Sequence, residues 1–354
     1  MAEARTRKIA VGMSGGVDSS VAAALLVGQG CEVIGLTAHM WKEGSRCCSE
    51  EDVRRARRVC RVLGIPHYVL NASEMFREYV VDPFVAEYAE GRTPSPCVNC
   101  NKKIKFGFLL TRAVQFGCAG LATGHYARIH PENGSHRLLK ARDPLRDQSY
   151  FLHRLNQRQL QHTTFPLGSM LKQDDVVTYA QSRGLPLAQR EESRDLCFVP
   201  DGQYGRFVEK MRPEVPRSGP VVATDGQRLG THAGIHNYTV GQRRGLGVFA
   251  QTPRYVVRIA ASDNTVEVGS RDEALCTTCM LRNVHWTKGI APDLSRTYKV
   301  RVRYMHQEET AVLRPHGEDS LHVEFSSPQF AVTPGQAGVI YDGDEVMGGG
   351  WIQV

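Results

Sequence analysis

The sequence predicts an α/β domain, with a parallel sheet covered by helices on both faces, followed by two small β-rich domains. Over the first 130 residues, short β-branched runs alternate with longer helical patterns, a rhythm typical of a mostly parallel sheet. After about Pro200, glycine and proline become frequent and short alternating strands replace the long helices. The chain of 354 residues is long enough for two or three domains. We therefore expect domains over residues 1–200, 201–275 and 276–354.

The elements of the first domain follow from these patterns and from helix start and stop signals. Strands are expected at Lys8–Met13, Glu32–His39, His67–Leu70 and Cys118–Thr123. Helices are expected at about Val17–Gly28, from the cap Ser49 to about Leu63, and at about Lys103–Phe116. A helical extension follows at Leu155–His162 and Gln173–Arg183. In such a sheet, ligands bind beyond the carboxyl ends of the strands.

The second half of the chain is expected to be β-rich, with a small central domain and then a β-barrel. Strands are expected at Tyr255–Ala260, Thr265–Val268, Tyr298–Tyr304, Leu321–Phe325 and Gly338–Tyr341. Turn signals such as Asp225-Gly226 fall between them. In the strand at residues 298–304, Lys299, Arg301 and Arg303 alternate with aromatic or aliphatic residues. One face of that strand can therefore pack while the other meets phosphates.

Composition narrows the classes of protein that this chain can belong to. No stretch approaches the roughly 18 consecutive apolar residues of a membrane span, and the first eight residues lack the apolar region of a secretory signal. We expect a cytoplasmic protein with no membrane partner, whose ten cysteines stay reduced. The net charge is +7, and residues 1–200 hold 27 Lys and Arg against 20 Asp and Glu. This excess is compatible with a polyanionic partner.

A loop rich in glycine and serine joins the first expected strand to the first expected helix. It reads Ser14-Gly15-Gly16-Val17-Asp18-Ser19-Ser20. Its glycines let the backbone approach a ligand closely, and N–H groups at the helix N-terminus can hold phosphate oxygens. Asp18 can hold a Mg²⁺ ion that bridges the phosphates. The loop lacks a Walker-type Gly-Lys-Ser/Thr and resembles the PP-loop of the ATP pyrophosphatases, which transfer AMP from ATP to a substrate oxygen. The plainer alternative is an ordinary N-cap turn.

Three cysteines, Cys97, Cys100 and Cys197, lie in segments that are expected to be loops near one sheet edge. Pro94 and Pro96 favour an extended backbone around the first two. The cluster Lys102, Lys103 and Lys105 follows, and its positive field is expected to lower the thiol pKa values. Buried apolar roles are expected for Cys31, Cys60 and Cys118. The spacing of half a zinc site is found at Cys276 and Cys279, with Cys47 and Cys48 as the first candidate partners, although an incidental or structural role is preferred there.

Seven segments, spread in order over nearly the whole chain, carry a specific set of motifs. They are Gly12–Ser20, Gly91–Phe106, Thr123–Tyr126, Asp147–Tyr150, Ser193–Phe198, Val302–Tyr304 and Pro334–Gln336. Together they resemble the bacterial tRNA-specific 2-thiouridylase family, tRNA-uridine 2-sulfurtransferases of the PP-loop superfamily with an adenine-nucleotide α-hydrolase-like fold. The resemblance implies that AMP is transferred from ATP to the C2 oxygen of the wobble uridine of tRNA. A sulfur nucleophile then attacks C2, AMP departs, and 2-thiouridine is formed.

The resemblance also implies roles for individual residues and partners. Cys197 would carry the persulfide. Cys100 would either attack that persulfide to free sulfide or pair with Cys197 as a disulfide when turnover ends. The implied cofactor is ATP with Mg²⁺, and the implied partners are tRNA and a cysteine desulfurase or sulfur-relay protein as sulfur donor. The C-terminal barrel would contact the tRNA.

The remaining site residues are implied by position. ATP would be bound by Gly12, Met13, Ser14, Gly15, Gly16, Val17, Asp18, Ser19, Met40 and Gly124. The flipped-out target base would be contacted by Ser95, Pro96 and Cys97. The tRNA would be contacted by His125, Arg146, Asp147, Gln148, Arg303, Tyr304 and Gln336. Two alternatives stay open, a packed histidine at His125 and a solvated strand face at Arg303.

The chain departs from the family pattern at Cys97, where most members have aspartate. The general acid or base role of that aspartate does not carry over to a thiol. Instead, Cys97, Cys100 and Cys197 would suit a 4Fe–4S cluster with one open iron that delivers hydrosulfide, or a zinc ion. The alternative is that Cys97 is passive and that persulfide chemistry runs on the other two cysteines.

Two rival functions remain. One is another PP-loop adenylating enzyme of the amidotransferase type, but the sequence offers no glutaminase domain and amide formation has no use for two cysteines. The other is a catalytically inactive tRNA-binding protein, against which the intact Asp18, Ser19, Cys100 and Cys197 argue.

Overall fold

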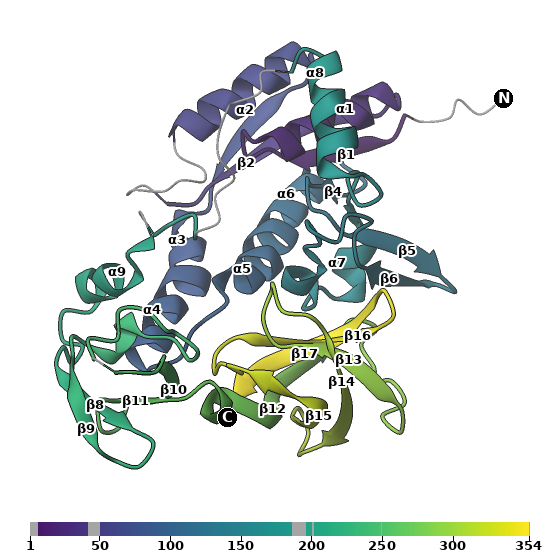
Figure 1. Ribbon diagram of the computed structural model, residues 1–354. Helices are drawn as coiled ribbons and strands as arrows, with labels where there is room; N and C mark the ends of the chain where they lie inside the picture. The colour runs from purple at the N-terminus through teal and green to yellow at the C-terminus, as the bar shows by residue number, and fades with distance from the viewer. Residues whose placement is uncertain (1–5, 42–49, 186–195, 200–201, 249, 354) are drawn as a thin grey trace.

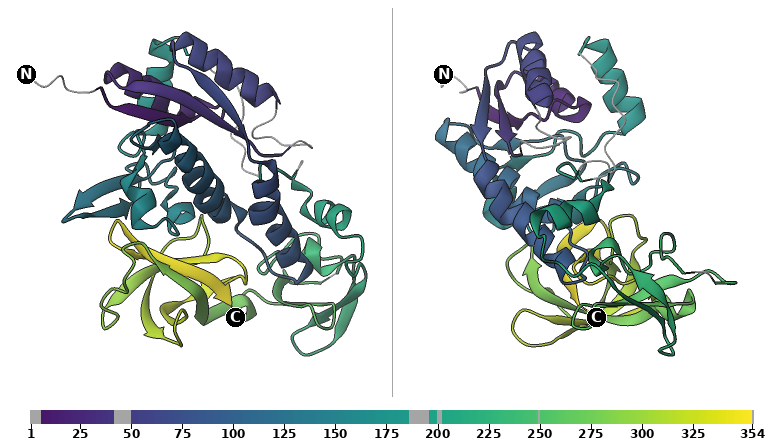
Figure 2. Two further views of the ribbon diagram at one scale, coloured as in Figure 1. Left: turned by 180° about the vertical axis from the view of Figure 1, so that it is seen from behind. Right: turned by 90° about the vertical axis from the view of Figure 1, so that its left-hand side faces the viewer.

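The structure is a computed structural model that describes residues 6–41, 50–185, 196–199, 202–248 and 250–353. An α/β domain lies at the top of Figure 1, and two β domains lie side by side beneath it. The view from behind shows the same arrangement (Figure 2). The predicted Ser49 cap, Cys47, Cys48 and the start of the Ser193–Phe198 segment fall outside the described residues.

A five-stranded parallel sheet forms the centre of the α/β domain. Its strands run in the order β3-β2-β1-β4-β7, and every neighbouring pair is parallel. The strands are β1 (Lys8–Gly12), β2 (Glu32–His39), β3 (His67–Asn71), β4 (Leu121–Ala122) and β7 (Thr163–Thr164). The predicted parallel sheet is confirmed, with β2 at its predicted bounds. β4 is shorter than predicted, and β7 is an additional edge strand.

Helices cover both faces of this sheet, as predicted. Alternate residues of β1 face opposite sides, so that Ile9 and Val11 pack with α1 (Val17–Gly28) in one apolar cluster, while Ala10 joins Phe84 and Ile104 in the other. Further helices are α2 (Glu50–Val62), α7 (Gln157–Gln161), the consecutive η4 (Lys172–Val177) and α8 (Thr178–Ser182), and α9 (Tyr204–Met211). Within the described residues, every helix is too short or too polar to cross a bilayer.

Two long helical segments connect the sheet with the β domains below it (Figure 1). The first is formed by α3 (Ser73–Phe76), η1 (Arg77–Val81) and α4 (Asp82–Ala89). The second is formed by α5 (Pro96–Asn99), η2 (Cys100–Leu109) and α6 (Leu110–Gln115). The prediction that Cys97 and Cys100 lie in a loop is therefore wrong. Pro96 occupies the first helical turn, where proline is tolerated because the missing N–H would have no helical partner.

The central domain is a four-stranded sheet in the order β10-β11-β8-β9. Its strands are β8 (Gly219–Ala223), β9 (Arg228–His232), β10 (Tyr255–Ala260) and β11 (Thr265–Gly269). β11 pairs in parallel with β8, and the other pairs are antiparallel. The predicted turn at Asp225-Gly226 joins β8 to β9, and Gly226 has a positive φ of 86°.

The C-terminal domain is an antiparallel barrel, which confirms the second predicted β-rich domain. Its six strands follow the order β12-β15-β14-β13-β16-β17, and a β12–β17 pairing closes the barrel. They are β12 (Leu275–Trp286), β13 (Thr297–Arg301), β14 (Glu309–Pro315), β15 (Leu321–Phe330), β16 (Ala337–Asp342) and β17 (Glu345–Gln353). A hairpin of the first domain, β5 (Arg128–Glu132) and β6 (Ser135–Leu139), adds to β17 through Glu345 and Leu139.

The predicted strand Tyr298–Tyr304 is too long at its C-terminal end. β13 stops at Arg301, so Arg303 and Tyr304 lie beyond the strand and outside its alternation. Arg301 itself forms ion pairs with Asp147 and Glu308. The prediction that one face of the strand is left for phosphates therefore fails for Arg301.

Several buried histidines make the fold sensitive to acid. His153 is fully buried, and its Nδ1 lies 2.8 Å from the Tyr150 carbonyl oxygen. Burial lowers its pKa to about 3, with smaller effects from Arg154, His285 and Lys102. Burial also lowers the pKa of five further histidines, which are His67, His125, His232, His285 and His306.

We predict that stability falls as the pH drops below about 6.5. In that range the unfolded chain binds protons that the folded histidines do not bind. The two fully buried histidines, His125 and His153, each remove up to about 1.4 kcal/mol of stability per pH unit, and the partly exposed ones remove less. Melting curves from pH 7.5 to 5 should show this loss. His153→Asn should lower the melting temperature at pH 7.5 and flatten its pH dependence, whereas His130→Asn, at an exposed site on β5, should leave the slope unchanged. An unchanged slope in His153→Asn would contradict the prediction.

Candidate active site

The glycine- and serine-rich loop lies where the sequence predicts it, between β1 and α1. The Ser14 N–H donates to Ser19 Oγ over 3.3 Å, and the Ser14 and Ser19 hydroxyls are 3.2 Å apart. Ser19 Oγ in turn donates to the Gly16 carbonyl over 3.0 Å. Gly15 has a φ of 76°, and a Cβ there would lie 2.6 Å from the Asp52 carbonyl oxygen. The loop is thus a compact turn that brings hydroxyl groups to the start of a helix, where anions bind.

The end of β4 packs directly against this loop. A Cβ on Gly124 would lie 2.6 Å from the Asp18 carbonyl carbon and 2.7 Å from the Ser19 nitrogen. Glycine is therefore required at position 124 by the backbone of the loop itself. Met13 is buried, and its carbonyl accepts from the Thr37 hydroxyl over 2.7 Å. Met40, predicted near adenine, is buried just beyond the end of β2.

Asp18 has two partners that sequence reasoning missed. The Tyr126 hydroxyl donates to Asp18 Oδ1 over 2.8 Å, and Lys172 Nζ lies 2.5 Å from the same oxygen. Tyr126 is fixed by Gln148, whose Oε1 accepts from the Tyr126 N–H over 3.0 Å. Tyr126 belongs to the motif at residues 123–126, so the sequence already placed it near the candidate site. Lys172 was not visible, because it lies far along the chain at the start of a helical segment.

His125 is buried between two phenylalanines rather than displayed on the surface. Its Nε2 lies 3.2 Å from Lys105 Nζ, and its Nδ1 lies 2.7 Å from Thr123 Oγ1. Burial, assisted by the charge of Lys105, holds the pKa of His125 well below its usual value. The neutral ring therefore accepts from the ammonium at Nε2 and donates to the threonine at Nδ1. Its predicted contact with tRNA stays a prediction.

Two of the three cysteines, Cys97 and Cys100, lie in the helical segment that starts at Pro96. Cys100 is buried in the main apolar cluster of the α/β domain, and Cys197 is half-buried against the same cluster. Cys97 is half-buried. Burial raises the pKa of the Tyr304 phenol, and the nearby Cys97 adds a smaller effect in the same direction. All three are reduced thiols. Among the residues that the structure describes, no three His, Cys, Asp or Glu side chains form a group able to hold a metal ion.

Cys276 and Cys279 lie on β12 in the barrel, far along the chain from the other thiols. Cys279 is buried in the barrel core, and burial raises its pKa to about 12. Such a thiol is inert at neutral pH. This agrees with the preferred structural role over half a zinc site.

The segment before Pro96 is held by both β domains. Gln336 Nε2 donates to the Thr93 and Pro94 carbonyls over 2.8 and 3.1 Å, and the Thr93 N–H donates to the Pro334 carbonyl over 2.9 Å. The Thr93 hydroxyl bonds Thr239 of the central domain over 3.1 Å. Gln336, a predicted tRNA contact, therefore anchors the backbone that leads into the Ser95, Pro96 and Cys97 segment.

Arg303 and Tyr304, which follow β13 of the barrel, each contact a residue of another domain. Arg303 donates to Thr333 Oγ1 over 2.6 Å and to the Val240 and Ala331 carbonyls over 3.3 and 3.4 Å. Burial lowers its pKa from the ordinary arginine value. Tyr304 packs on Phe151, with ring centroids 4.4 Å apart. Arg303 thus joins the central domain to the barrel, and its predicted tRNA contact stays a prediction.

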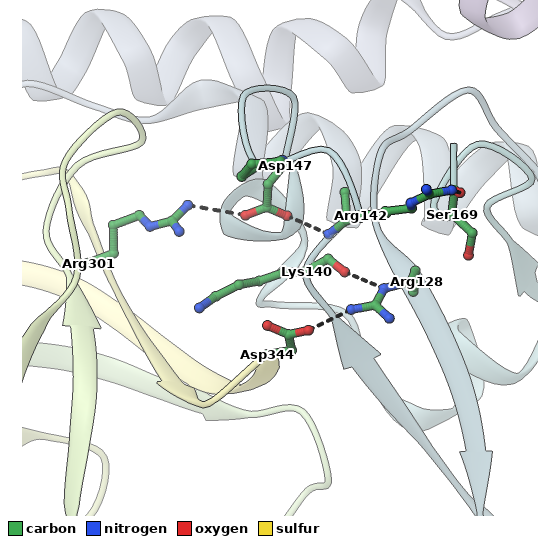
Figure 3. A pocket seen from close by; sticks show the side chains of 9 residues that line it. Arg128, Lys140, Arg142, Asp147, Ser169, Arg301 and Asp344 are labelled. Carbon is green, nitrogen blue, oxygen red and sulfur yellow. Dashed lines mark hydrogen bonds and ion pairs between the residues drawn. The ribbon is translucent and has the colours of Figure 1, made fainter. Parts of the chain in front are cut away.

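Asp147 is buried at the junction of the first domain and the barrel. Its carboxylate accepts from the Ala141 and Ser149 N–H groups and from Arg301, at distances of 3.1 to 3.2 Å. Figure 3 shows Arg301 pointing from the barrel toward Asp147 at the edge of a pocket of about 450 Å³. Arg128 and Asp344 pair across the same pocket at 2.7 Å. The neighbouring Arg146 is half-exposed.

Comparisons with known proteins agree with this geometry. Three family models match consecutive parts of the chain: a tRNA methyl transferase HUP domain at residues 7–201, a tRNA methyl transferase PRC-barrel domain at 205–270 and an aminomethyltransferase β-barrel domain at 276–352. The tRNA-specific 2-thiouridylase MnmA of Acidithiobacillus ferrooxidans is 44% identical over 98% of both chains. The enzyme of the same name from Magnetococcus marinus is 45% identical over 98% of this chain and 99% of its own.

The chain belongs to the tRNA-specific 2-thiouridylase family. Membership confirms the resemblance that the motifs predict and covers all three domains. An amidotransferase is not supported, since the matching relatives span almost the full length of the chain and carry the thiouridylase name. A structural likeness to a predicted tRNA methyltransferase subunit from Methanocaldococcus jannaschii, with 18% identity, half of this chain and three quarters of the other chain covered, and a TM-score of 0.33, is too weak to add to this.

We predict that Gly124→Ala impairs nucleotide binding in this member of the family. The new Cβ would push against backbone atoms of Asp18 and Ser19, and overpacking of this kind costs about 1–3 kcal/mol. The affinity for ATP should fall at least about tenfold, as measured by calorimetry. The matched control is Gly28→Ala at the far end of α1, where the added Cβ meets only ordinary contacts. Wild-type affinity in Gly124→Ala would refute the close packing.

We also predict that Gln336→Leu slows thiolation without weakening tRNA binding. The substitution removes two hydrogen bonds of about 1 kcal/mol each that hold the segment before Cys97. Turnover should fall about tenfold, while tRNA affinity measured by filter binding should change less than twofold. Gln329→Leu, elsewhere in the barrel, is the control. A large loss of tRNA affinity with unchanged turnover would instead establish Gln336 as a tRNA contact.

Proposed function

We propose that this chain converts the wobble uridine of tRNA to 2-thiouridine at the edge of the parallel sheet, with ATP as the activating substrate. The observation that carries the proposal is the link between the phosphate loop and the helical segment that carries Cys97 and Cys100. Gly124 packs on the backbone of Asp18 and Ser19, and the next residue, His125, contacts Lys105 of that segment. The C2 oxygen of uracil is a poor leaving group, so its displacement by sulfur needs prior activation. Family membership supports this reaction over any other adenylation.

In the first step, the C2 oxygen would attack the α-phosphorus of ATP, and pyrophosphate would leave with the electrons of the broken bond. The N–H groups at the start of α1 and the Ser14 and Ser19 hydroxyls would hold the phosphates. Asp18 would hold the Mg²⁺ ion of Mg–ATP through a carboxylate oxygen, and that ion would neutralise phosphate charge. One protein carboxylate with several phosphate oxygens is the usual arrangement for Mg²⁺.

In the second step, the persulfide on Cys197 would supply the sulfur that replaces AMP at C2. The Cys100 thiolate would attack Cys197 Sγ, which breaks the sulfur–sulfur bond, forms a Cys100–Cys197 disulfide and releases the outer sulfur, either as hydrosulfide that then attacks C2 or from a persulfide sulfur already bonded to C2. AMP would depart with the electron pair of its bond to C2, and an external thiol would reduce the disulfide before the next turnover. The location of both cysteines on one apolar cluster supports their use as a pair. The sulfur donor would be a cysteine desulfurase or a sulfur-relay protein. We propose the persulfide route over an iron–sulfur cluster or a zinc ion, since no group of three metal-ligating side chains is found among the described residues.

The target base would be received by Ser95, Pro96 and Cys97, with Tyr304 beside them. Burial raises the pKa of the Tyr304 phenol, with smaller effects from nearby charges that include Arg146 and Cys97. The nearness of these groups to the phenol supports a tRNA path that passes Arg146, Tyr304 and Cys97. Direct tRNA contacts are proposed for Arg146 and Tyr304, whereas His125, Asp147, Gln148, Arg303 and Gln336 would act chiefly by holding neighbouring groups in place.

The test is nucleoside analysis of a tRNA transcript after incubation with the purified protein, ATP and a persulfide donor. 2-Thiouridine should form on a tRNA with uridine at the wobble position and be absent when cytidine replaces it. Pyrophosphate release should require the same uridine. Release of pyrophosphate without any thiolated nucleoside would overturn the proposal.

We predict that Cys197→Ser and Cys100→Ser abolish thiolation but retain uridine-dependent pyrophosphate release. An alcohol cannot carry or receive the transferred sulfur, whereas adenylation needs neither thiol. Both activities should be followed in the same reactions. The control is Cys31→Ser, a half-buried cysteine just after α1, which should behave as the wild type. Full thiolation by Cys197→Ser would remove the persulfide role from Cys197.

A further inference from the structure

A buried lysine reaches the phosphate loop from a distant part of the chain. The side chain of Lys172 is only 8% exposed, and its Nζ lies on Asp18 Oδ1. It also lies over the Tyr126 ring, 5.9 Å from the centroid. The motifs that identify the family do not include this residue. Lys172 is therefore a charged group at the loop to which no role has been given.

The position of Lys172 is held from several sides. Its N–H donates to Asp143 Oδ2 over 3.0 Å, and Asp143 is itself buried. The preceding N–H, of Leu171, donates to Asp175 Oδ2 over 2.7 Å. Because both backbone groups are fixed, the flexible part of the residue is the side chain beyond Cβ. The ammonium can therefore change partner within the site while its attachment to the fold stays constant.

The cost of burying the ammonium argues for a ligand at this place. The Lys172 side chain is 8% exposed and that of Asp18 is 35% exposed, so the ammonium loses its hydration beside a carboxylate that keeps part of its own. The attraction between two such charges repays the desolvation only poorly. A carboxylate at the loop also repels the polyanion that the loop has to bind. Both problems disappear if the lysine has a second partner when ATP is bound, because the ammonium then neutralises phosphate charge and Asp18 is released to the magnesium ion.

We propose that Lys172 is a catalytic residue that binds the β- and γ-phosphates of ATP and stabilises pyrophosphate as it leaves. This inference rests on the proposed use of ATP at the loop. As the bond from the C2 oxygen to the α-phosphorus forms, the bond from the α-phosphorus to its bridging oxygen breaks, and the electron pair stays on the β-phosphate. Lys172 remains protonated throughout and offsets the growing negative charge. In the ligand-free protein the ammonium is paired with Asp18.

The alternative is a structural role in which Lys172 only neutralises Asp18. The two roles differ in which ligands they affect. A group that binds the β- and γ-phosphates affects ATP and pyrophosphate but not AMP, since AMP lacks those phosphates. A purely structural group affects the melting temperature, and it affects all three ligands alike or none of them.

The experiment measures the affinity of the full-length chain for Mg–ATP, Mg–pyrophosphate and AMP by calorimetry. Lys172→Met should weaken ATP and pyrophosphate binding at least tenfold and change AMP binding less than twofold. Lys172→Arg should recover part of the pyrophosphate affinity. The matched control is Lys8→Met, which removes a lysine paired with Glu32 at the opposite end of β1 and should leave all three affinities unchanged. An equal loss for ATP and AMP, or no loss for either, would overturn the proposal.

A second variant and a parallel thiolation assay separate a failure of this role from a failure of the proposed function. If Lys172→Met does not fold, Lys172→Gln is measured in its place, because its amide is polar and uncharged and should show the same selective loss. Wild-type protein is also assayed for 2-thiouridine in parallel. A Lys172-dependent preference for ATP over AMP in a protein that forms no 2-thiouridine would refute the proposed function and leave the role of Lys172 standing. Thiolation with no Lys172-dependent preference would refute the role and leave the function.

Discussion

The anchoring of residues 93 and 94 by the barrel is the constraint on which the active site depends. Two backbone carbonyls just before Pro96 are held by one glutamine amide from the C-terminal domain, and the adjacent threonine hydroxyl is held by the central domain. The helix that carries Cys97 and Cys100 starts immediately afterwards. The two β domains therefore hold the backbone that leads into the helix of Cys97 and Cys100.

Much of the α/β domain was predictable because its signals are local. The apolar run of β2 and the helix after Gly16 give their own bounds, and the order of elements implies the parallel sheet. The start of the long helix at Pro96 was misread because proline favours an extended backbone before it and a helical first turn at its own position. Pro94 and Pro96 together favour the prediction of a loop, whereas in the structure Pro96 is the first residue of a helix. The overlong strand at residues 298–304 arose because alternation persists by chance beyond the last ladder partner of β13.

The candidate site was predictable only as far as its motifs reach. Gly124 is predicted to contact the nucleotide, but the structure gives another reason for a glycine there: a Cβ would collide with the backbone of Asp18 and Ser19. Lys172 and Lys105 could not be assigned from the sequence, because nothing local links them to Asp18 or His125. Such pairs depend on how the sheet edge and the following loops fold back on each other. A sequence motif identifies residues that are close together in the chain. The Lys172–Asp18 and Lys105–His125 contacts instead join residues that are 154 and 20 positions apart.

The tRNA contacts predicted at Arg303, Asp147 and Gln336 come from the family resemblance and stay predictions. In the structure each of these side chains has hydrogen-bond partners within the protein, and Arg303 and Asp147 are at domain junctions. The half-buried guanidinium of Arg303 already bonds two carbonyls and a hydroxyl, so it gains little by exchanging them for a phosphate, since its desolvation has already been compensated. Loss of such a residue would disturb RNA thiolation through the shape of the site. The affinity for the tRNA backbone then has to come from cations that remain exposed to solvent, where neutralising phosphates releases counterions.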